Sequence, residues 1–305
     1  MLFRFSNKRN LFFYTILTAI ILSPIILHIL TRIVLAPVRA DLSEIQTSNR
    51  LEPIEIDSNG IKLKAWRLVS RSEKGIILLL HGIRANKSSM LPRAEFLANA
   101  GYSSILLDFQ AHGESEGDLI TLGIKESENV RDTIRFIKKN YPNKPIGILG
   151  TSLGGASALL ADISENLDFL ILEAVYSRIE DAIRNRLNNR LFKPLGLFTP
   201  IVLVWLQFEL DLSKTGLRPI DHLQNLKCPV FIISGEEDPY TFTTETNEMY
   251  EISPNPKKLW LVKGVGHVDL YSYSKKEYEN NILNFINIYI QKIRPGIKDN
   301  EYKTY

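Results

Sequence analysis

The sequence predicts an α/β fold in which a mostly parallel sheet carries helices on both faces. Short apolar runs alternate along the chain with longer stretches whose apolar residues recur at helical spacing. Continuous apolar runs are typical of strands buried on both faces, and alternation of strands with helices predicts parallel pairing. The alternation starts near residue 53 and ends with a helix over about 275–293.

The individual elements follow from local periodicity. Segments 53–57 and 61–69 alternate apolar and polar residues on either side of the turn sequence SNG, which predicts an antiparallel hairpin. Buried strands are predicted at the apolar runs 75–80, 103–108, 144–150, 167–174, 228–234 and 258–263. Helices are predicted over about 89–100, 120–140 and 152–161.

Between about residues 176 and 226 the alternation stops, and two or three helices are expected instead. The apolar run in this segment is shorter than the roughly 20 residues that a membrane-spanning helix needs. We therefore expect a helical lid inserted in the α/β domain. Its apolar side chains either pack the lid onto the body or form an apolar acyl pocket or a membrane-facing surface.

Composition narrows the class of protein. The chain has 305 residues, 45% hydrophobic and 23% charged, which are ordinary values for a globular protein. The single cysteine, Cys228, excludes an internal disulfide, and no zinc-type spacing of Cys or His occurs, so no metal is expected. The net charge of +3 depends on the basic residues of segment 1–40, so the body offers no basic surface for nucleic acid.

The N-terminal segment predicts a membrane anchor. Residues 11–31 contain no charged side chain except the weakly basic His28, and their length matches the roughly 30 Å hydrocarbon core of a bilayer. Arg4, Lys8 and Arg9 precede the segment, which favours a cytoplasmic N-terminus and a body on the outer side. The chain is thus divided into an anchor region, 1–40, and an α/β domain with the helical insertion, 41–305.

Two alternatives to the anchor stay open. The small residues of the sequence VRA before residue 41 would suit a signal peptidase, but the apolar stretch exceeds the usual 7–15 residues of a signal core. A buried soluble helix is the second alternative, although the segment is apolar all round.

The sequence GILGTSLGGASALL, residues 147–160, places Ser152 between Gly150 and Gly154 at the junction of a predicted strand and a predicted helix. One interpretation is a nucleophile on a sharp strand-to-helix turn, with the helix start directing free N–H groups toward the site. The other is a junction whose glycines serve packing alone. Other parts of the chain decide between the two.

The loop after strand 75–80 supplies candidate oxyanion donors. Gly82 in the sequence HGIRANKSSM allows close approach of the backbone, so the N–H of Ile83 would join that of Leu153 in binding an oxyanion. His81 is then expected to brace the loop and not to act as the base.

An acid and a base follow the last two predicted strands. Asp238 in GEEDPYT is the best acid candidate, with Glu236 and Glu237 as alternatives, and His267 in KGVGHVDLY is the base candidate. Serine, acid and histidine occur in the chain order of one hydrolase superfamily, each directly after a strand. This joint pattern favours the nucleophile interpretation of Ser152.

The body, roughly 52–293, resembles the alpha/beta-hydrolase superfamily, in particular small bacterial serine hydrolases described as esterase-like or peptidase-like. The resemblance rests on HG at 81–82, DFQAHGESEG at 108–117, GTSLGG at 150–155, GEEDPY at 235–240 and GH at 266–267. It implies an eight-stranded sheet, a lid between strands six and seven, and a loop near the pocket formed by Asp108 with a structural His112. It also implies a triad of Ser152, Asp238 and His267, with backbone amides of Ile83 and Leu153 at the oxyanion.

The predicted reaction is hydrolysis of a carboxylic ester, possibly lipid-like, through an acyl-enzyme, without a metal or an organic cofactor. A serine peptidase or amidase acting on short peptides is an alternative, because the same triad cleaves amides. A non-catalytic, membrane-anchored binding protein is a third. The expected partner is a small ester or acyl substrate, and the sequence gives no oligomeric state.

Overall fold

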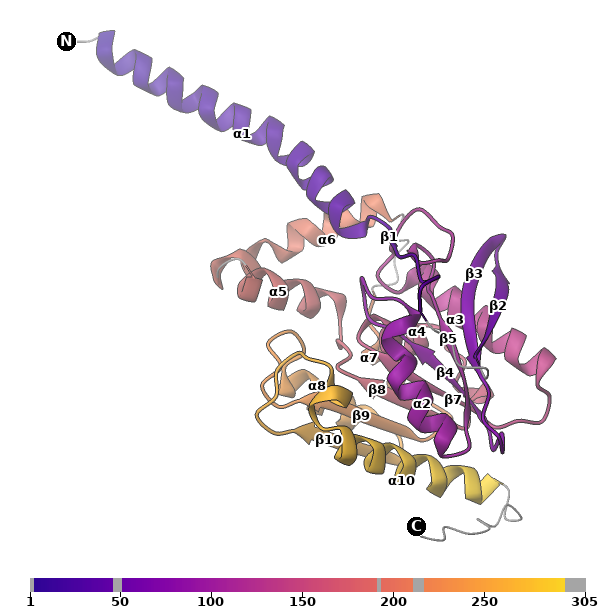
Figure 1. The fold of residues 1–305 in the computed structure, drawn as a ribbon. Coiled ribbons are helices and arrows are strands. Elements are labelled where there is room, and N and C mark those ends of the chain that lie inside the picture. Colours follow the sequence, from indigo (N-terminus) through magenta and orange to yellow (C-terminus); the bar gives the residue numbers. More distant parts are fainter. Residues whose placement is uncertain (1–2, 46–50, 191–192, 211–216, 294–305) are drawn as a thin grey trace.

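The body is built on a sheet of eight strands, most of them parallel (Figure 1). The structure is a computed structural model that describes residues 3–45, 51–190, 193–210 and 217–293. The strand order is β10-β9-β8-β7-β4-β5-β3-β2, with antiparallel pairing only in β2–β3 and β3–β5. The strands are β2 (Leu51–Ser58), β3 (Ile61–Leu68), β4 (Ile76–Leu80), β5 (Ser103–Leu107), β7 (Ile146–Thr151), β8 (Phe169–Glu173), β9 (Val230–Gly235) and β10 (Lys257–Val262).

Helices cover both faces of this sheet, and successive strand residues belong to different apolar cores. On β4, for example, Ile76 packs in one core and Ile77 in the other. The first core contains residues of α3 (Ile124–Asn140) and α4 (Leu153–Leu160), and the second contains residues of α2 (Leu91–Asn99) and α10 (Lys275–Ile293). The predicted alpha/beta-hydrolase arrangement of a mostly parallel sheet between helices is therefore confirmed.

The observed elements follow the predicted ones closely, including the hairpin of β2 and β3. The structure adds helix α8 (Thr243–Ile252) and a short parallel pair, β1 (Val38–Arg39) with β6 (His112–Gly113). Periodicity did not reveal these elements, because α8 has few apolar residues and two-residue strands are too short to show a pattern.

Helices connect β8 to β9 at the place where the insertion was predicted. They are α5 (Ile179–Arg190), the 3-10 helix η3 (Lys193–Phe198), α6 (Thr199–Glu209) and α7 (Ile220–Leu223). Leu206 of α6 packs in the first core, whereas Leu197 and Phe208 are about four-fifths exposed, at 81% and 80%. Phe192, which the sequence analysis included in this segment, lies outside the described residues. The role of these helices as a lid stays a prediction.

The N-terminal segment forms one long helix, α1 (Phe3–Leu35), which continues through Pro24 and projects away from the body (Figure 1). Only its C-terminal end is built into the body: Leu35 is fully buried, and its carbonyl accepts a hydrogen bond from the N–H of Ile120 at 2.8 Å. Beyond the helix, β1 pairs with β6. The body therefore fixes the end of α1, and contacts cross the predicted boundary at residue 40.

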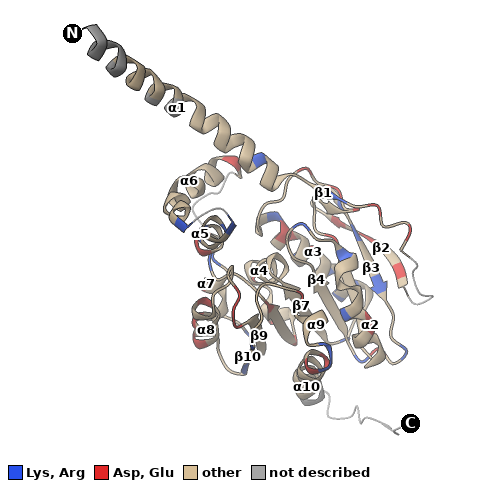
Figure 2. Cartoon of the chain, turned by 60° about the vertical axis from the view of Figure 1, so that its left-hand side comes forward, with Lys and Arg blue, Asp and Glu red and all other residues tan. Residues whose placement is uncertain are grey.

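From residue 10 to its C-terminal end, α1 carries one charged residue, Arg32, and Figure 2 shows this basic position near the end of the helix. A search of the described residues finds no helix that is both long and apolar enough to cross a membrane. Residues 16, 19 and 20 of the predicted span have side chains outside the described part of the structure. The membrane anchor stays a prediction.

A buried ionic cluster joins elements that surround the loops of the candidate site. Arg93 on α2, only 3% exposed, donates hydrogen bonds to Glu173 at the end of β8 (2.7 Å) and to Asp269 (2.6 Å). Tyr278 on α10 donates to the same Glu173 carboxylate at 2.7 Å. Asp269 lies two residues after His267, so the cluster ties the loop that carries His267 to β8 and α2.

We expect Glu173→Gln to destabilise the protein by about 3 kcal/mol, because removal of one charge from a buried ion pair leaves the other uncompensated. Asp269 still faces Arg93 in this variant, which keeps the loss near the lower end of the usual range. Denaturant unfolding with Glu165→Gln, an exposed position, as the control measures the difference. A loss below about 1 kcal/mol would show that the pair contributes no more than a surface ion pair.

Candidate active site

Ser152 lies at the turn between β7 and α4, at the edge of the sheet where the parallel strands end. Its backbone has φ +48° and ψ −112°, an unusual conformation for a residue with a side chain. Such conformations cost about 1–3 kcal/mol and persist where the surroundings enforce them. Here the Ser152 N–H donates to the carbonyl of Glu173 on β8 at 2.8 Å. The strained turn has the geometry of a nucleophile elbow.

The glycines around Ser152 are required by close packing. A Cβ atom at Gly150 would lie 2.5 Å from the nitrogen of Gly155, and one at Gly154 would lie 2.4 Å from the carbonyl oxygen of Leu80. A Cβ at Gly155 would meet Val175 at 2.3 Å. No side chain fits at these distances. The glycines of this turn are therefore needed for packing, and the same turn carries Ser152 in the strained conformation of a nucleophile elbow.

The loop after β4 passes directly beside Ser152. A Cβ atom built on Gly82 would lie 3.6 Å from the Cβ of Ser152, which places the following residue, Ile83, at the same site. Within the described residues, the N–H groups of Ile83 and Leu153 have no intramolecular acceptor. The structure thus brings together the two predicted oxyanion donors and leaves both free for a ligand.

His81 and His112 are buried in the floor of this loop region. His81 is fully buried, with Nδ1 bonded to the Gly82 carbonyl at 2.8 Å and Nε2 accepting from the N–H of Phe109 at 3.3 Å. Burial, with a smaller effect from His112, lowers the pKa of His81 to about 3. Both ring nitrogens hold loops together, which confirms the bracing position of His81.

Asp238 and His267 meet at the carboxyl ends of β9 and β10. The N–H groups of Glu236 and Glu237 donate to the carbonyls of Val262 and Val265, both at 2.9 Å, so the two loops share backbone hydrogen bonds. His267 Nδ1 lies 2.7 Å from Asp238 Oδ2.

The alternative acids Glu236 and Glu237 are exposed, whereas Asp238 is only 2% exposed. Asp238 Oδ1 accepts the N–H groups of Tyr240 and Thr241 at 2.8 and 3.0 Å, which leaves Oδ2 for the histidine. Burial alone would raise the pKa of Asp238, but the hydrogen bond and charge of His267 and the backbone donors lower it below its usual value. The carboxylate is therefore held in its ionised form beside the imidazole.

Among the hydrogen bonds of the described residues, none joins Ser152 to His267. Catalytic hydrogen bonds are often long in unliganded enzymes and shorten in the substrate complex. The structure thus brings Asp238 to His267, and Ile83 and Leu153 to Ser152, while the roles of these residues stay predictions.

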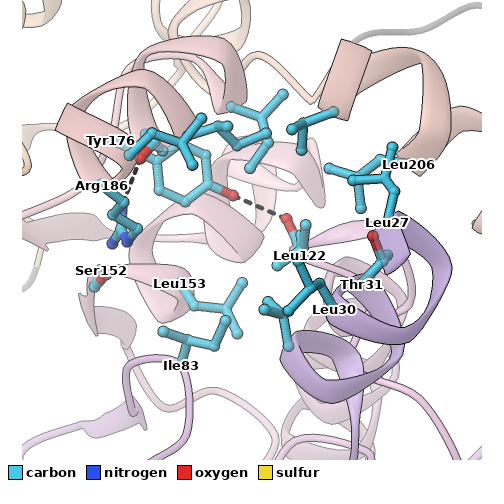
Figure 3. Close-up of a pocket in the computed structure, with 16 residues that line it drawn as sticks. Leu27, Leu30, Thr31, Ile83, Leu122, Ser152, Leu153, Tyr176, Arg186 and Leu206 are labelled. Carbon is cyan, nitrogen blue, oxygen red and sulfur yellow. Dashed lines mark hydrogen bonds between the residues drawn. The ribbon is translucent and has the colours of Figure 1, made fainter. Parts of the chain in front are cut away.

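A cavity of about 280 Å³ opens beside Ser152 (Figure 3). Its walls are mainly apolar side chains from α1, the loop after β4, α5 and α6. The residues that line it are Leu27, Leu30, Thr31, Val34, Ile83, Leu122, Ser152, Leu153, Tyr176, Ile179, Ala182, Ile183, Arg186, Leu187, Val202 and Leu206. This volume is near the lower end of the range for small-molecule sites, so the cavity suits one slender apolar group.

Arg186 on α5 is the charged side chain among these lining residues, and Figure 3 shows it above Ser152. Its Nη1 donates to the Ala182 carbonyl at 3.0 Å, and its guanidinium lies 5.4 Å from the centre of the Tyr240 ring. Burial lowers the pKa of Arg186 below its usual value. Within the described part of the chain it has no carboxylate partner, so a positive charge faces the cavity.

The described residues contain no group of three or more His, Cys, Asp or Glu side chains placed to hold a metal ion. Cys228 is buried, and burial raises the pKa of its thiol to about 12, which leaves it unreactive.

Sequence reasoning missed two features of the site. Neither the wall formed by α1 nor the position of Arg186 gives a local signal, because a helical periodicity does not tell which distant loop a helix face meets. The apolar character of 11–31 favoured a membrane anchor over a cleaved signal peptide or a buried helix, and none of these interpretations located the cavity.

Comparison with known proteins agrees with this fold. The model of a family described as serine aminopeptidase, S33, matches residues 71–214, which include Ser152 but not Asp238 or His267. The chain is 22% identical to the uncharacterized protein YqkD of Bacillus subtilis over 74% of this chain and 76% of that protein. It is 25% identical to the lysophosphatidylserine lipase ABHD12 of Danio rerio over 62% of this chain and 50% of that protein.

Among solved structures, the Pyrococcus furiosus esterase Pf2001 matches with a TM-score of 0.68 at 23% identity, over 84% of this chain and 98% of that chain. The sheet, the strained serine turn and the match to Pf2001 are those of the alpha/beta-hydrolase fold. The matched family model, the esterase structures and the lipase relatives support a hydrolase.

The contact between α5 and α8 predicts a pH-dependent stability. Asn185 donates to Glu245 Oε1 at 2.8 Å, whereas Oε2 is buried without a hydrogen-bond partner in the described residues. Burial raises the pKa of Glu245 to about 7, with Asp181 raising it further and Asn185, Arg184 and Arg178 lowering it. The native protein therefore keeps a proton that the unfolded chain, with a pKa near 4.5, releases.

The unfolding free energy should consequently fall as the pH rises from about 4.5 through about 7. Glu245→Gln removes this proton exchange, so we expect the difference in Tm between about pH 5 and about pH 8 to narrow. Glu251→Gln, an exposed position on the same helix, is the control. An unchanged difference in Glu245→Gln would contradict the raised pKa.

Proposed function

We propose that the protein is a carboxylic ester hydrolase that works through an acyl-enzyme on Ser152. The observation that carries the proposal is the position of Ser152: it sits on a strained turn at the wall of an apolar cavity, beside two free backbone N–H groups. A serine in this setting can attack a carbonyl group whose developing oxyanion is bound by the N–H groups of Ile83 and Leu153.

The geometry of Asp238 and His267 supports the proton transfers of this mechanism. Because Asp238 accepts a hydrogen bond from the N–H at His267 Nδ1, the lone pair of the imidazole is on Nε2 and is free to take the Ser152 proton. His267 acts as the general base that accepts the Ser152 proton during acylation, and then as the general acid that gives it to the leaving alcohol. A water then attacks the acyl-enzyme by the same route, and the ionised Asp238 stabilises the imidazolium.

An apolar acyl group is the substrate part that the cavity favours. Its lining is mainly aliphatic, with polar side chains at the Ser152 end and Thr31 on the α1 wall, which agrees with a lipid-like ester. ABHD12 of Danio rerio, one of the relatives, is described as a lysophosphatidylserine lipase, and Pf2001 as an esterase. The matched family is described as an aminopeptidase, but an amino terminus needs an anionic partner, and the cavity presents Arg186 instead.

The helices between β8 and β9 act as the lid in this proposal, and α1 anchors the enzyme in the membrane with the body on the outer side. Exposed apolar side chains on α6 and η3, among them Leu197 and Phe208, support a lid that faces lipid. The close position of α1 and α6, joined by the hydrogen bond between His28 and Glu209, would hold this surface beside the anchor. Substrate would then reach the cavity from the bilayer.

We expect Ser152→Ala to abolish labelling by a serine-reactive phosphonate and to lower ester hydrolysis by about four orders of magnitude or more. Ser89→Ala, an exposed serine on the loop after β4, is the matched control and should keep both. The substrates are p-nitrophenyl esters of graded chain length, measured beside aminoacyl amides. Unchanged labelling of Ser152→Ala would contradict the nucleophile, and faster turnover of the amides would favour the peptidase.

We expect the full chain to sediment with membranes and to resist alkaline extraction. The double variant Leu22→Lys and Ile25→Lys should lose this association, because each charge in the middle of a span costs about 3 kcal/mol. Ser89→Lys adds one lysine on the body, and the single variant Leu22→Lys adds one in the span; only Ser89→Lys should stay with the membrane as the wild type does. Full chain that remains in the supernatant of a detergent-free lysate would contradict the anchor, and reporter fusions at the C-terminus test the orientation.

A further inference from the structure

Helix α1 supplies one wall of the cavity beside Ser152. Leu27, Leu30, Thr31 and Val34 all line it, and their spacing of three to four residues places them on one face of the helix. Figure 3 shows Leu27, Leu30 and Thr31 on one side of the cavity and Ser152 with Arg186 on the opposite side. The wall formed by α1 thus lies at the end of the cavity that is away from the nucleophile.

Several contacts hold this face of α1 against the body. Thr31 and Leu35 are buried, at 6% and 0% exposed, and the Leu35 carbonyl accepts the N–H of Ile120. Further along the helix, His28 Nδ1 pairs with the Glu209 carboxylate at the end of α6, and the His28 ring contacts Trp205 at 6.3 Å between centroids. Contacts at two successive turns fix both the position and the rotation of α1.

The chemistry of this wall is mainly that of a hydrocarbon site. Leu27, Leu30 and Val34 are aliphatic, Thr31 adds one hydroxyl, and Leu206 and Val202 of α6 continue the aliphatic lining. The hydroxyl of Tyr176 is already used, because it donates to the Leu122 carbonyl at 2.9 Å. Burial of an apolar chain against such a surface contributes about 0.8 kcal/mol per methylene, whereas a polar group there would lose its hydration.

We propose that α1 forms the far wall of the acyl-chain site, and that Leu27 and Leu30 limit the length of the single unbranched acyl chain that Ser152 accepts. The inference rests on the ester hydrolysis proposed above. It assigns to the N-terminal helix a part in substrate selection in addition to any role in anchoring. The acyl chain lies between α1 and α6, with its ester carbonyl at Ser152 and its methyl end against Leu27 and Leu30.

The test uses the full chain in one detergent and compares Leu27→Trp and Leu30→Trp with Ile29→Trp. Ile29 lies on the same helix, is 51% exposed and does not line the cavity, so it receives the same added bulk on another face. For both wall variants, kcat/KM on p-nitrophenyl dodecanoate should fall by at least about tenfold, since small volume changes in apolar pockets discriminate by this much. Turnover of p-nitrophenyl acetate should fall much less in the wall variants, because a short acyl group does not reach the wall, and Ile29→Trp should keep turnover of both esters within about twofold.

A second variant and a second readout keep the result interpretable. Leu27→Ala enlarges the site and should shift the preferred ester toward longer chains. Binding of dansyl-undecanoic acid reports occupancy without any chemistry and should weaken by about tenfold in Leu27→Trp but not in Ile29→Trp.

A chain-length profile of the wall variants that matches that of Ile29→Trp would overturn the inference, even with active enzyme. A wild type that cleaves no ester would overturn the proposed function. In that case the fatty-acid probe still tests the inference. Weaker binding by Leu27→Trp than by Ile29→Trp supports the wall, and equal or tighter binding counts against it.

Discussion

The close contact of α4 with β4 and β7 sets the geometry on which the whole site depends. At Gly154 the backbone comes so near to Leu80 that a Cβ atom would lie 2.4 Å from its carbonyl oxygen. Because the helix begins this close to the sheet, its first N–H group faces the same space as the loop that carries Ile83. The strained φ of Ser152 is a consequence of this packing, and the carbonyl of Glu173 holds the turn in place. The position of Ser152 is therefore determined by contacts of the backbone and does not depend on contacts of its side chain.

Glu173 connects this turn to the rest of the site. Its backbone carbonyl holds the Ser152 amide, while its side chain binds Arg93 and Tyr278. Arg93 in turn binds Asp269, in the loop that presents His267. Arg93, Glu173 and Tyr278 are buried in this network and Asp269 is half-exposed. The buried members resist movement, because each would lose a strong interaction. The loops of the nucleophile and of the histidine are thus fixed relative to one another through α2 and β8, although no direct bond joins Ser152 to His267.

The sequence revealed the parts of this structure that depend on local patterns. The buried strands were predictable because apolar runs bounded by turns leave few alternatives, and the elbow was predictable because Gly150 and Gly154 flank a serine at a strand–helix junction. Asp238 was preferred over Glu236 and Glu237 only by resemblance and position, and the structure shows the physical reason: the two glutamates are exposed and Asp238 is buried between backbone donors. The Arg93 cluster left no sequence signal, because its members are distant in the chain and pair only after folding.

Helix α1 is a second element whose role depends on contacts with residues that are distant in the chain. An apolar helix that only crosses a bilayer needs length and hydrophobicity, and its rotation about its own axis is of no consequence to an enzyme attached to it. In this protein the bond between the Leu35 carbonyl and Ile120 sets the rotation, and a shift of one residue would turn the helix by roughly 100°. Leu27 and Leu30 would then leave the cavity, and His28 would leave Glu209. The rotation of α1 therefore links the packing of Leu35 in the core to the shape of the cavity that Ser152 faces.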